Sequence, residues 1–383
     1  MRAVVISDLH LGAGGGGDLL RRAAFRAALF EALEPSDRVV LLGDLIELRD
    51  RPIDEAFALA EPFLRELTEA VPEGELIVVP GNHDHHLVES WLERRLLEGE
   101  PPLGLEQRVE SEATPLATLV RELSGASIEI AYPGIWLRDD VYATHGHYLD
   151  RHLTVPTFER LGVAAVERLL GVHPGGPDPL EPPTDTPEER AGRIDPVTYE
   201  HAQSPVYALL FALAQGAGGE RGTGNPSARI WNAVGAGDTA GAKLRGWLLG
   251  SVAVPGAVGL ANRLGLGPVR SDLSPGAITR AGLAAMREVI ERLGIEAEHV
   301  IFGHTHRRGP LGDEPGWAPS NGDSCLWNTG SWLYSPTMLA STASRSPYWP
   351  GTICIVGEEG EPELRHLLDD RSRNDLAKGE SGG

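Results

Sequence analysis

Five short polar segments constrain the fold of this chain more than any other feature, because each directly follows a run of aliphatic residues. They are far apart in the sequence: Ser7–His10, Gly43–Glu47, Gly81–Asp84, Thr144–His147 and Gly303–His306. The preceding runs have the length and the β-branched content of buried strands. Asp, Asn and His side chains are therefore expected to gather at the ends of strands.

Helical patterns separate the first strand-like runs, which are Ala3–Ser7, Arg38–Gly43 and Glu75–Pro80. The helices are expected at Asp18–Leu33 and Asp54–Val71. Strands that alternate with helices indicate βαβ units and a largely parallel α/β sheet. The carboxyl ends of parallel strands form the ligand-binding edge of such a sheet. Asp8, Asp44 and Asn82 all fall at these ends, so the sequence predicts one shared site.

The remaining segments of regular structure surround a region of different composition. A helix is expected at Leu87–Leu97, and further elements at Ser127–Ala131, Gly134–Leu137, Val141–Thr144, Pro275–Leu293 and His299–Gly303. Ser324–Asn328 and Thr352–Val356 are expected to complete a second sheet. Between these parts, 151–272 is rich in Pro, Gly and Ala, with helical patterns near 155–170 and 206–215. We predict a core of 1–150 plus 273–368, a mostly helical insertion at 151–272 and a flexible tail at 369–383.

Charge and cysteine content exclude some classes of protein. The net charge of -21 argues against strong nucleic-acid binding, which depends on neutralising phosphates with basic residues. Two cysteines, Cys325 and Cys354, are too few for a disulfide framework. The first residues are typical of a buried strand rather than a signal peptide, so the expected location is the cytoplasm.

The residue types at the strand ends are those that bind transition metals. Asp8 and His10 are two residues apart, so in an extended strand their side chains leave on the same face. A carboxylate with an imidazole suits manganese, iron, zinc or nickel better than magnesium or calcium. Asp44 offers a carboxylate that can bridge two ions, and Asn82 offers an amide oxygen. The late histidines add imidazole nitrogens: His145, His304 and His306.

The ordered set of segments resembles the calcineurin-like metallophosphoesterase superfamily, over roughly 1–150 and 275–360. The resemblance implies a four-layer sandwich of two mixed β-sheets flanked by helices. It also implies that a first metal takes Asp8, His10, Asp44 and His306. A second metal would take Asp44, Asn82, His145 and His304. Manganese is the expected metal, with iron, zinc or nickel as alternatives.

The same resemblance assigns catalytic roles to His83 and Glu47. His83 would stand beside the leaving group as a general acid, and Glu47 would orient it. A carboxylate partner helps to keep a histidine protonated. Asp84 is expected to brace the turn or a ligand. The roles of His85, His86 and His147 stay open between a contact with substrate and an ordinary loop position.

The resemblance implies a binuclear phosphohydrolase that cleaves phosphomonoesters or phosphodiesters by attack of a metal-bound hydroxide. One alternative is a lipid-linked pyrophosphate hydrolase, similar to the UDP-2,3-diacylglucosamine hydrolases. Those enzymes typically carry Arg at the position of His83, which favours the general phosphoesterase. A nuclease and a non-catalytic scaffold are further alternatives. The acidic balance disfavours the nuclease, and the complete ligand set disfavours the scaffold.

The segment Trp247–Ala261 is the most apolar part of the predicted insertion, with Arg245 and Arg263 on either side. Three interpretations stay open for this segment. It forms a buried helical pair, it lies on a membrane or a lipid-like substrate as an amphipathic surface, or it spans a membrane. Glycine and proline interrupt it, which disfavours the span.

Overall fold

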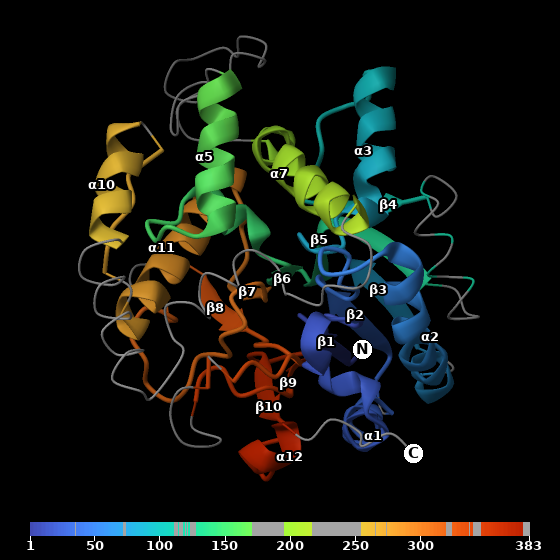
Figure 1. Cartoon of the computed structure of the whole chain (residues 1–383). Coiled ribbons are helices and arrows are strands. Elements are labelled where there is room, and N and C mark those ends of the chain that lie inside the picture. The colour runs from blue at the N-terminus through green and yellow to red at the C-terminus, as the bar shows by residue number, and fades with distance from the viewer. Residues whose placement is uncertain are drawn as a thin grey trace. The chain divides into compact units, whose positions relative to one another are not determined.

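The computed structural model describes residues 1–34, 36–71, 74–110, 114, 118, 120, 122, 128–170, 195–216, 254–264, 266–272, 274–318, 324–336, 338–339 and 346–377. The chain has two compact units (Figure 1). The first holds the described residues of Met1–Gly146, Leu210–Thr223 and Glu296–Gly383. The second holds those of His147–Leu209 and Gly224–Ile295.

The first unit is built on a mixed sheet of 10 strands, so its α/β class agrees with the prediction. In chain order the strands are β1 (Ala3–Ile6), β2 (Arg38–Leu42), β3 (Glu75–Val79), β4 (Glu106–Val109), β5 (Ile128–Arg138), β6 (Val141–Thr144), β7 (His299–Phe302), β8 (Cys325–Asn328), β9 (Thr352–Val356) and β10 (Glu363–His366). Their order in the sheet is β10-β9-β1-β2-β3-β5-β6-β7-β8, and β4 pairs with β5. Parallel pairing joins β1, β2, β3 and β5, and separately β6, β7 and β8.

The long strand β5 connects the two parallel groups. Its first residues pair with β3 and its last residues pair antiparallel with β6. The two segments predicted as separate strands in this region are therefore one strand. A single buried core contains residues from both groups, among them Val5, Val40, Ile77, Ala143 and Ile301. Aliphatic side chains from the two groups thus exclude water together.

The predicted place of Thr352–Val356 in a second sheet is wrong. This strand, β9, pairs antiparallel with β1 and places Val356 opposite Ala3. Every residue of β9 is buried, and such a uniformly apolar run carries no pattern that identifies its neighbour. Two strands, β4 and β10, were not predicted. Their sequences, EQRV and ELRH, are polar and lack an aliphatic run.

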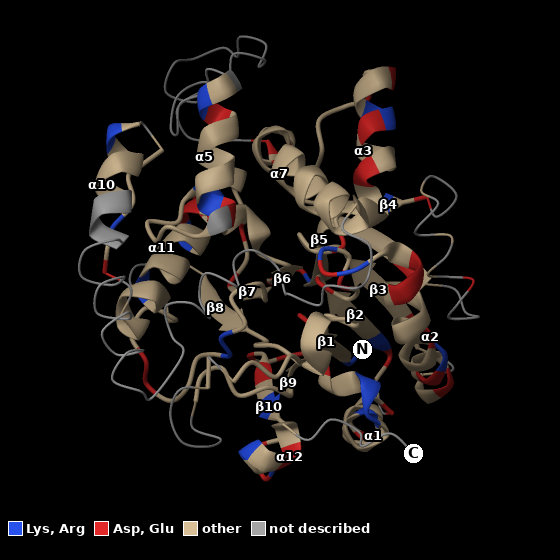
Figure 2. Cartoon of the chain, viewed as in Figure 1, with Lys and Arg blue, Asp and Glu red and all other residues tan. Residues whose placement is uncertain are grey.

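Helices of the first unit follow its parallel strands. They are η1 (Gly14–Gly16), η2 (Leu19–Arg21), α1 (Ala23–Leu33), α2 (Ile53–Ala70), α3 (His86–Glu98) and, near the C-terminus, α12 (Arg373–Ala377). Helix α2 buries Phe57, Ala60, Leu64 and Leu67, which recur at helical spacing and form one apolar face. Acidic and basic residues are interspersed along α3 (Figure 2), which is typical of a solvent-facing surface. The tail predicted to be flexible contains α12, whose Leu376 is buried, whereas 378–383 lie outside the described residues.

The described elements of the second unit are helical. They are η4 (His147–Arg151), α5 (Phe158–Leu170), the first part of α7 (Pro196–Gly216), α10 (Val254–Arg263) and α11 (Pro275–Leu293). This unit starts at His147, includes α11 and excludes the end of α7, so its limits differ from the predicted 151–272. The predicted roles of core and insertion stay predictions. Among the described helices, none is long and apolar enough to cross a membrane. The first half of Trp247–Ala261 lies outside the described residues.

A buried polar cluster lies inside the second unit. Arg151 donates from Nε to Glu167 Oε1 at 2.6 Å, and both side chains are almost completely buried. Arg160 donates to the carbonyl oxygen of Leu153 at 2.9 Å. His152 lies 2.8 Å from the Tyr199 hydroxyl. Burial, together with the nearby Arg151 charge, lowers the pKa of His152 to about 3.

Candidate metal centre

The predicted ligands lie at the carboxyl ends of the parallel strands, as the βαβ pattern indicated. Asp8 follows β1, Asp44 follows β2 and Asn82 follows β3. His145 and His304 follow β6 and β7 from the other parallel group. Because all these strands belong to the first unit, their ends bring residues from both parts of the chain to one centre.

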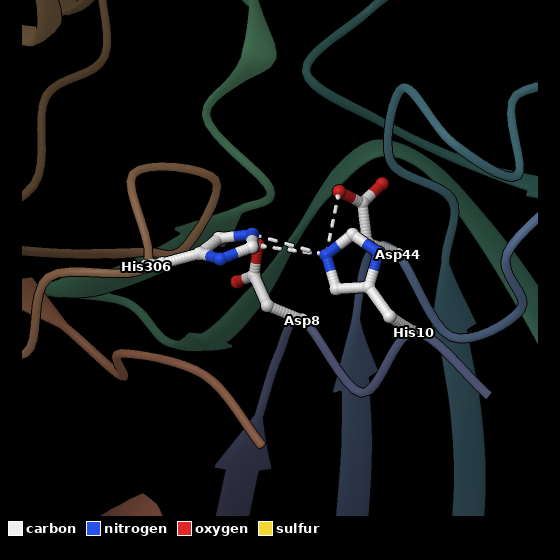
Figure 3. A group of neighbouring side chains, drawn as sticks. All are labelled: Asp8, His10, Asp44 and His306. Carbon is white, nitrogen blue, oxygen red and sulfur yellow. Dashed lines mark hydrogen bonds and ion pairs between the residues drawn. The ribbon is translucent and has the colours of Figure 1, made fainter. Parts of the chain in front are cut away.

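One group of side chains converges around His10 (Figure 3). His10 Nε2 lies 3.0 Å from His306 Nε2 and 3.6 Å from Asp44 Oδ2. His306 Nε2 lies 3.2 Å from Asp8 Oδ1. Two nitrogens at right angles on one cation, each about 2.1 Å from it, lie roughly 3.0 Å apart. The facing nitrogens of His10 and His306 therefore have the spacing of two ligands on one ion.

A second group of side chains also includes Asp44. Asp44 Oδ2 lies 3.4 Å from His145 Nε2. Asn82 Oδ1 lies 3.2 Å from the same nitrogen and 3.1 Å from His304 Nδ1. The structure thus brings the seven residues predicted as ligands into two groups that share Asp44.

The backbone at these ligands is strained. Five of the predicted ligands have positive φ angles: Asp8 (54°), His10 (47°), Asp44 (52°), His304 (65°) and His306 (55°). Side chains disfavour this left-handed region, and such residues cluster at functional sites. Neighbouring glycines allow close approach. A Cβ at Gly43 would lie 2.1 Å from His145 Nδ1, and one at Gly303 would lie 2.4 Å from Asp8 Oδ2.

Hydrogen bonds orient the ligand atoms toward the centre. His145 donates from Nδ1 to the Leu42 carbonyl oxygen at 3.0 Å, which leaves the Nε2 lone pair facing Asp44. Asp8 Oδ2 accepts hydrogen bonds from the His304 amide at 3.0 Å and from the Ser7 hydroxyl. Its other oxygen, Oδ1, is buried and lies 3.2 Å from His306 Nε2. A buried carboxylate is costly unless positive charge compensates it, so this donor set fits metal ions.

Residues 1–183 match the family model for calcineurin-like phosphoesterases. This part of the chain belongs to that family. No curated protein matches the chain. The matched segment contains five of the predicted ligands: Asp8, His10, Asp44, Asn82 and His145. His304 and His306 lie beyond it, and the fold brings them to the same centre.

The carboxylate of Glu47 contacts two histidines at once. His83 donates from Nδ1 to Glu47, with distances of 2.8 and 2.7 Å to the two carboxylate oxygens. His10 donates from Nδ1 to Glu47 Oε2 at 2.9 Å. The contact with His83 agrees with the predicted pairing. The contact with His10 was not predicted, because nothing in the spacing of the two segments indicates it.

Asp84 braces the loops that carry the ligands. Its Oδ1 accepts from the Gly81 amide at 2.7 Å, and its Oδ2 accepts from the Leu45 amide at 2.7 Å. The loop after β3 is thereby fixed to the loop after β2. Asn328 has a similar part elsewhere, since its Nδ2 donates to the Gly303 carbonyl oxygen at 2.8 Å.

The buried carboxylates and histidines change each other's proton affinities. Burial opposes the charged form of His10, but the Glu47 hydrogen bond and the Asp44 charge raise its pKa to about 9. Burial likewise opposes the charge of His145, but Asp44 raises its pKa to about 10. Despite burial, the charge of His145 holds the pKa of Asp44 well below its usual range. Metals bind neutral imidazole, so a cation must displace protons from these rings.

Of the three histidines left open by the sequence, His85 and His147 are buried and His86 is partly exposed. His147 is buried, and its ring packs against Tyr148 and Tyr207, with centroid distances of 4.7 and 5.8 Å. His85 is buried with its ring centroid 6.1 Å from that of Tyr132. His86 stacks on Phe211 of α7. These surroundings favour packing roles for His85 and His147.

Proposed function

We propose that the protein is a binuclear metal-dependent phosphohydrolase that cleaves phosphomonoesters or phosphodiesters. One observation carries the proposal: Asp44 Oδ2 lies 3.6 Å from His10 Nε2 and 3.4 Å from His145 Nε2, and these two histidines belong to two groups of side chains that share Asp44. A single oxygen between two groups of ligands is the arrangement that two-metal hydrolases need. Family membership of residues 1–183 supports a hydrolase of phosphate esters.

The proposed ligand sets follow the two groups of side chains. Asp8, His10, Asp44 and His306 would hold one ion, and Asp44, Asn82, His145 and His304 the other. Imidazole with carboxylate favours manganese, and accepts iron, zinc or nickel. When bound, two such ions supply Lewis acidity toward the phosphate and a water activated for in-line attack.

His83 is the proposed proton donor to the leaving group. Glu47 fixes its Nδ1, so Nε2 is the atom that faces the centre, 4.0 Å from Asp44 Oδ2. The Glu47 carboxylate stays ionised because, despite its burial, the His83 and His10 interactions lower its pKa. With Nδ1 bound to the Glu47 carboxylate, His83 Nε2 is the nitrogen that can donate a proton to a departing alkoxide oxygen. A histidine in this position favours a general phosphoesterase over the lipid-linked pyrophosphate hydrolase.

A proposed architecture for the first unit follows from its two groups of parallel strands. We infer that the two parallel groups of strands, joined by β5, form the inner layers of a four-layer sandwich. The common core of the two groups supports this inference. The lid or substrate-shaping role of the insertion at 151–272 and the membrane contact through 247–261 stay predictions.

A paired assay tests the proposed function. Chelator-stripped protein is supplied with manganese, zinc, nickel, iron or magnesium, then given p-nitrophenyl phosphate and bis-p-nitrophenyl phosphate. We expect transition metals to restore cleavage, and the ratio between the two substrates distinguishes a phosphatase from a phosphodiesterase. Protein that binds two metals per chain yet cleaves neither these esters nor phenyl phosphate would contradict the proposal.

A further inference from the structure

The end of helix α7 contacts the two loops that carry His83 and Glu47. α7 begins in the second unit, but its residues from Leu210 onward belong to the first. Phe211 and Gln215 lie four residues apart, so their side chains project from the same face of the helix. Each makes a specific contact with one of the two loops.

Gln215 holds the loop that follows Glu47. Its Oε1 accepts a hydrogen bond from the Ile53 amide at 2.9 Å. Its Nε2 lies 3.4 Å from the Leu48 carbonyl oxygen and 3.3 Å from the Arg51 carbonyl oxygen, and donates to both. One side-chain amide thus satisfies three backbone groups of the loop from Leu48 to Ile53, and its two ends recognise donor and acceptor separately.

This loop fixes the Glu47 side chain in turn. The Arg49 amide, which lies between the carbonyl groups held by Gln215, donates to Glu47 Oε1 at 2.9 Å. The same carboxylate accepts from His83 Nδ1 at 2.8 Å. A continuous series of hydrogen bonds and backbone therefore connects Gln215 with His83 through Glu47.

Phe211 holds the other loop through His86. The two rings are stacked, with centroids 3.5 Å apart and an interplanar angle of 28°. His86 Nε2 also lies 2.9 Å from Glu89 Oε2, which fixes the orientation of the imidazole. His86 begins α3 and follows His83 by three residues, so the stacked pair restrains the turn that carries His83.

We propose that Gln215 and Phe211 are positioning residues that hold the side chains of Glu47 and His83 in the orientation needed for proton transfer to the leaving group. The inference rests on the proposed role of His83 as the acid. Both residues belong to the segment 151–272 that the sequence predicts as an insertion. Through α7, this segment would position the proposed acid. Neither residue contacts any of the seven proposed ligands in the interactions described above. The Arg49 amide donates to Glu47 Oε1, whereas His10 donates to Oε2, so loss of Gln215 or Phe211 should change proton donation more than metal binding.

Substitution of Gln215 should affect substrates according to their leaving group. In Gln215→Ala we expect kcat for phenyl phosphate, whose leaving group needs a proton, to fall about 10-fold. Cleavage of p-nitrophenyl phosphate, KM and the metal content should change by less than about twofold, because its leaving group departs without an acid. Gln215→Glu keeps the acceptor for Ile53 but loses the donor, so it should show the same selective loss. Leu213→Ala is the matched control, since this side chain is 57% exposed on the same helix.

A double-mutant cycle with His83→Ala separates positioning from general damage. If Gln215 acts through His83, Gln215→Ala should have no further effect in the His83→Ala background, so the two losses are not additive. Equal loss on both esters in the single variant, or an undiminished effect in the double variant, would overturn the inference.

An NMR measurement that does not depend on turnover tests the positioning role separately from the proposed function. Zinc-loaded protein with ¹⁵N-labelled histidine reports the His83 Nδ1–H bond to Glu47. We expect this signal to shift or broaden in Gln215→Ala and Phe211→Ala, and to stay unchanged in Leu213→Ala. If wild-type protein cleaves no ester, the proposed function fails, while the signal still decides the positioning role. An unchanged His83 signal in both α7 variants would contradict it.

Discussion

Two buried polar clusters in this protein show opposite electrostatics. In the metal centre of the first unit, nearby carboxylates raise the pKa of His10 to about 9 and of His145 to about 10, although burial opposes both shifts. In the second unit, burial and nearby arginines lower the pKa of His152 to about 3. Burial lowers the pKa of all three histidines, so the sign of the neighbouring charge decides the difference.

The comparison shows which buried cluster is built to receive a cation. In the second unit, Arg151 already pairs with Glu167 at 2.6 Å, so the cluster supplies its own positive charge. In the first unit, Asp44 Oδ2 lies within 4.0 Å of nitrogens of His10, His83 and His145, and histidine nitrogens bind metals when neutral. The first cluster therefore gains most from added cations, and the second holds the fold without them.

Asp44→Asn tests the comparison with the largest expected effect. The substitution removes the charge shared by both groups, so both ions should be lost or nearly so. Activity should fall on the order of a thousandfold or more, since the charge stabilisation of the reaction depends on the ions. Metal content by mass spectrometry and turnover measure the result. Glu359→Gln, an exposed acidic residue, is the control, and full occupancy in Asp44→Asn would refute the bridging role.

Arg151→Met tests the opposite cluster. Removing one partner of a buried ion pair leaves Glu167 uncompensated, so the free energy of unfolding should fall by about 3–5 kcal/mol. Urea unfolding measures this loss. The exposed pair of Arg365 with Glu363 is the control, because Arg365→Met should change stability by less than about 1 kcal/mol. If the folded Arg151→Met protein loses its metals, the two clusters are not independent.

His83→Ala should separate acid catalysis from metal binding. We expect turnover of phenyl phosphate to fall about 100-fold, while p-nitrophenyl phosphate is affected far less, because only the first leaving group needs a proton. Metal content should stay unchanged, since His83 is not among the proposed ligands. Steady-state kinetics on both esters gives the comparison. Equal losses would remove His83 from the acid role.

The smallest of the expected effects is on the pH dependence of stability. In the metal-free protein, this dependence should differ between the two clusters. His10 and His145 have pKa values raised above the usual 6.5. Their contribution to the free energy of unfolding is present below about pH 6.5 and is lost as pH rises toward 9 and 10. His152 has a lowered pKa, so its contribution is present above about pH 6.5 and is lost as pH falls toward 3.

Thermal unfolding of two variants, measured as a function of pH, tests which histidine causes each change in stability. His10→Gln should reduce the loss of stability at alkaline pH, and His152→Gln should reduce the loss at acid pH. Added zinc should reverse the alkaline trend, because ligand histidines must lose their protons and metal affinity rises with pH. A loss of stability at acid pH that is unchanged in His152→Gln would show that another group controls it.

The sequence predicted the centre better than the sheet around it. Each predicted ligand stands directly after an apolar run, and parallel strands bring such positions to one edge whatever their separation in the chain. The strand pattern did not identify the neighbour of β9 in the sheet, because an apolar run can pair with any of several strands. It could not identify β4 or β10, whose residues are largely polar and partly exposed. The Glu47 contact with His10 and the Gln215 contacts depend on side-chain directions across long separations, which have no local pattern.

The central claim is that Asp44 lies between two metal ions. Crystals of zinc- or manganese-loaded protein, with anomalous diffraction measured at the metal edge, test it most directly. The account predicts two anomalous peaks about 3.5–4 Å apart, one on each side of Asp44 Oδ2. One ion should lie among Asp8, His10 and His306, and the other among Asn82, His145 and His304. A single peak, or two peaks that do not share Asp44, would contradict the account.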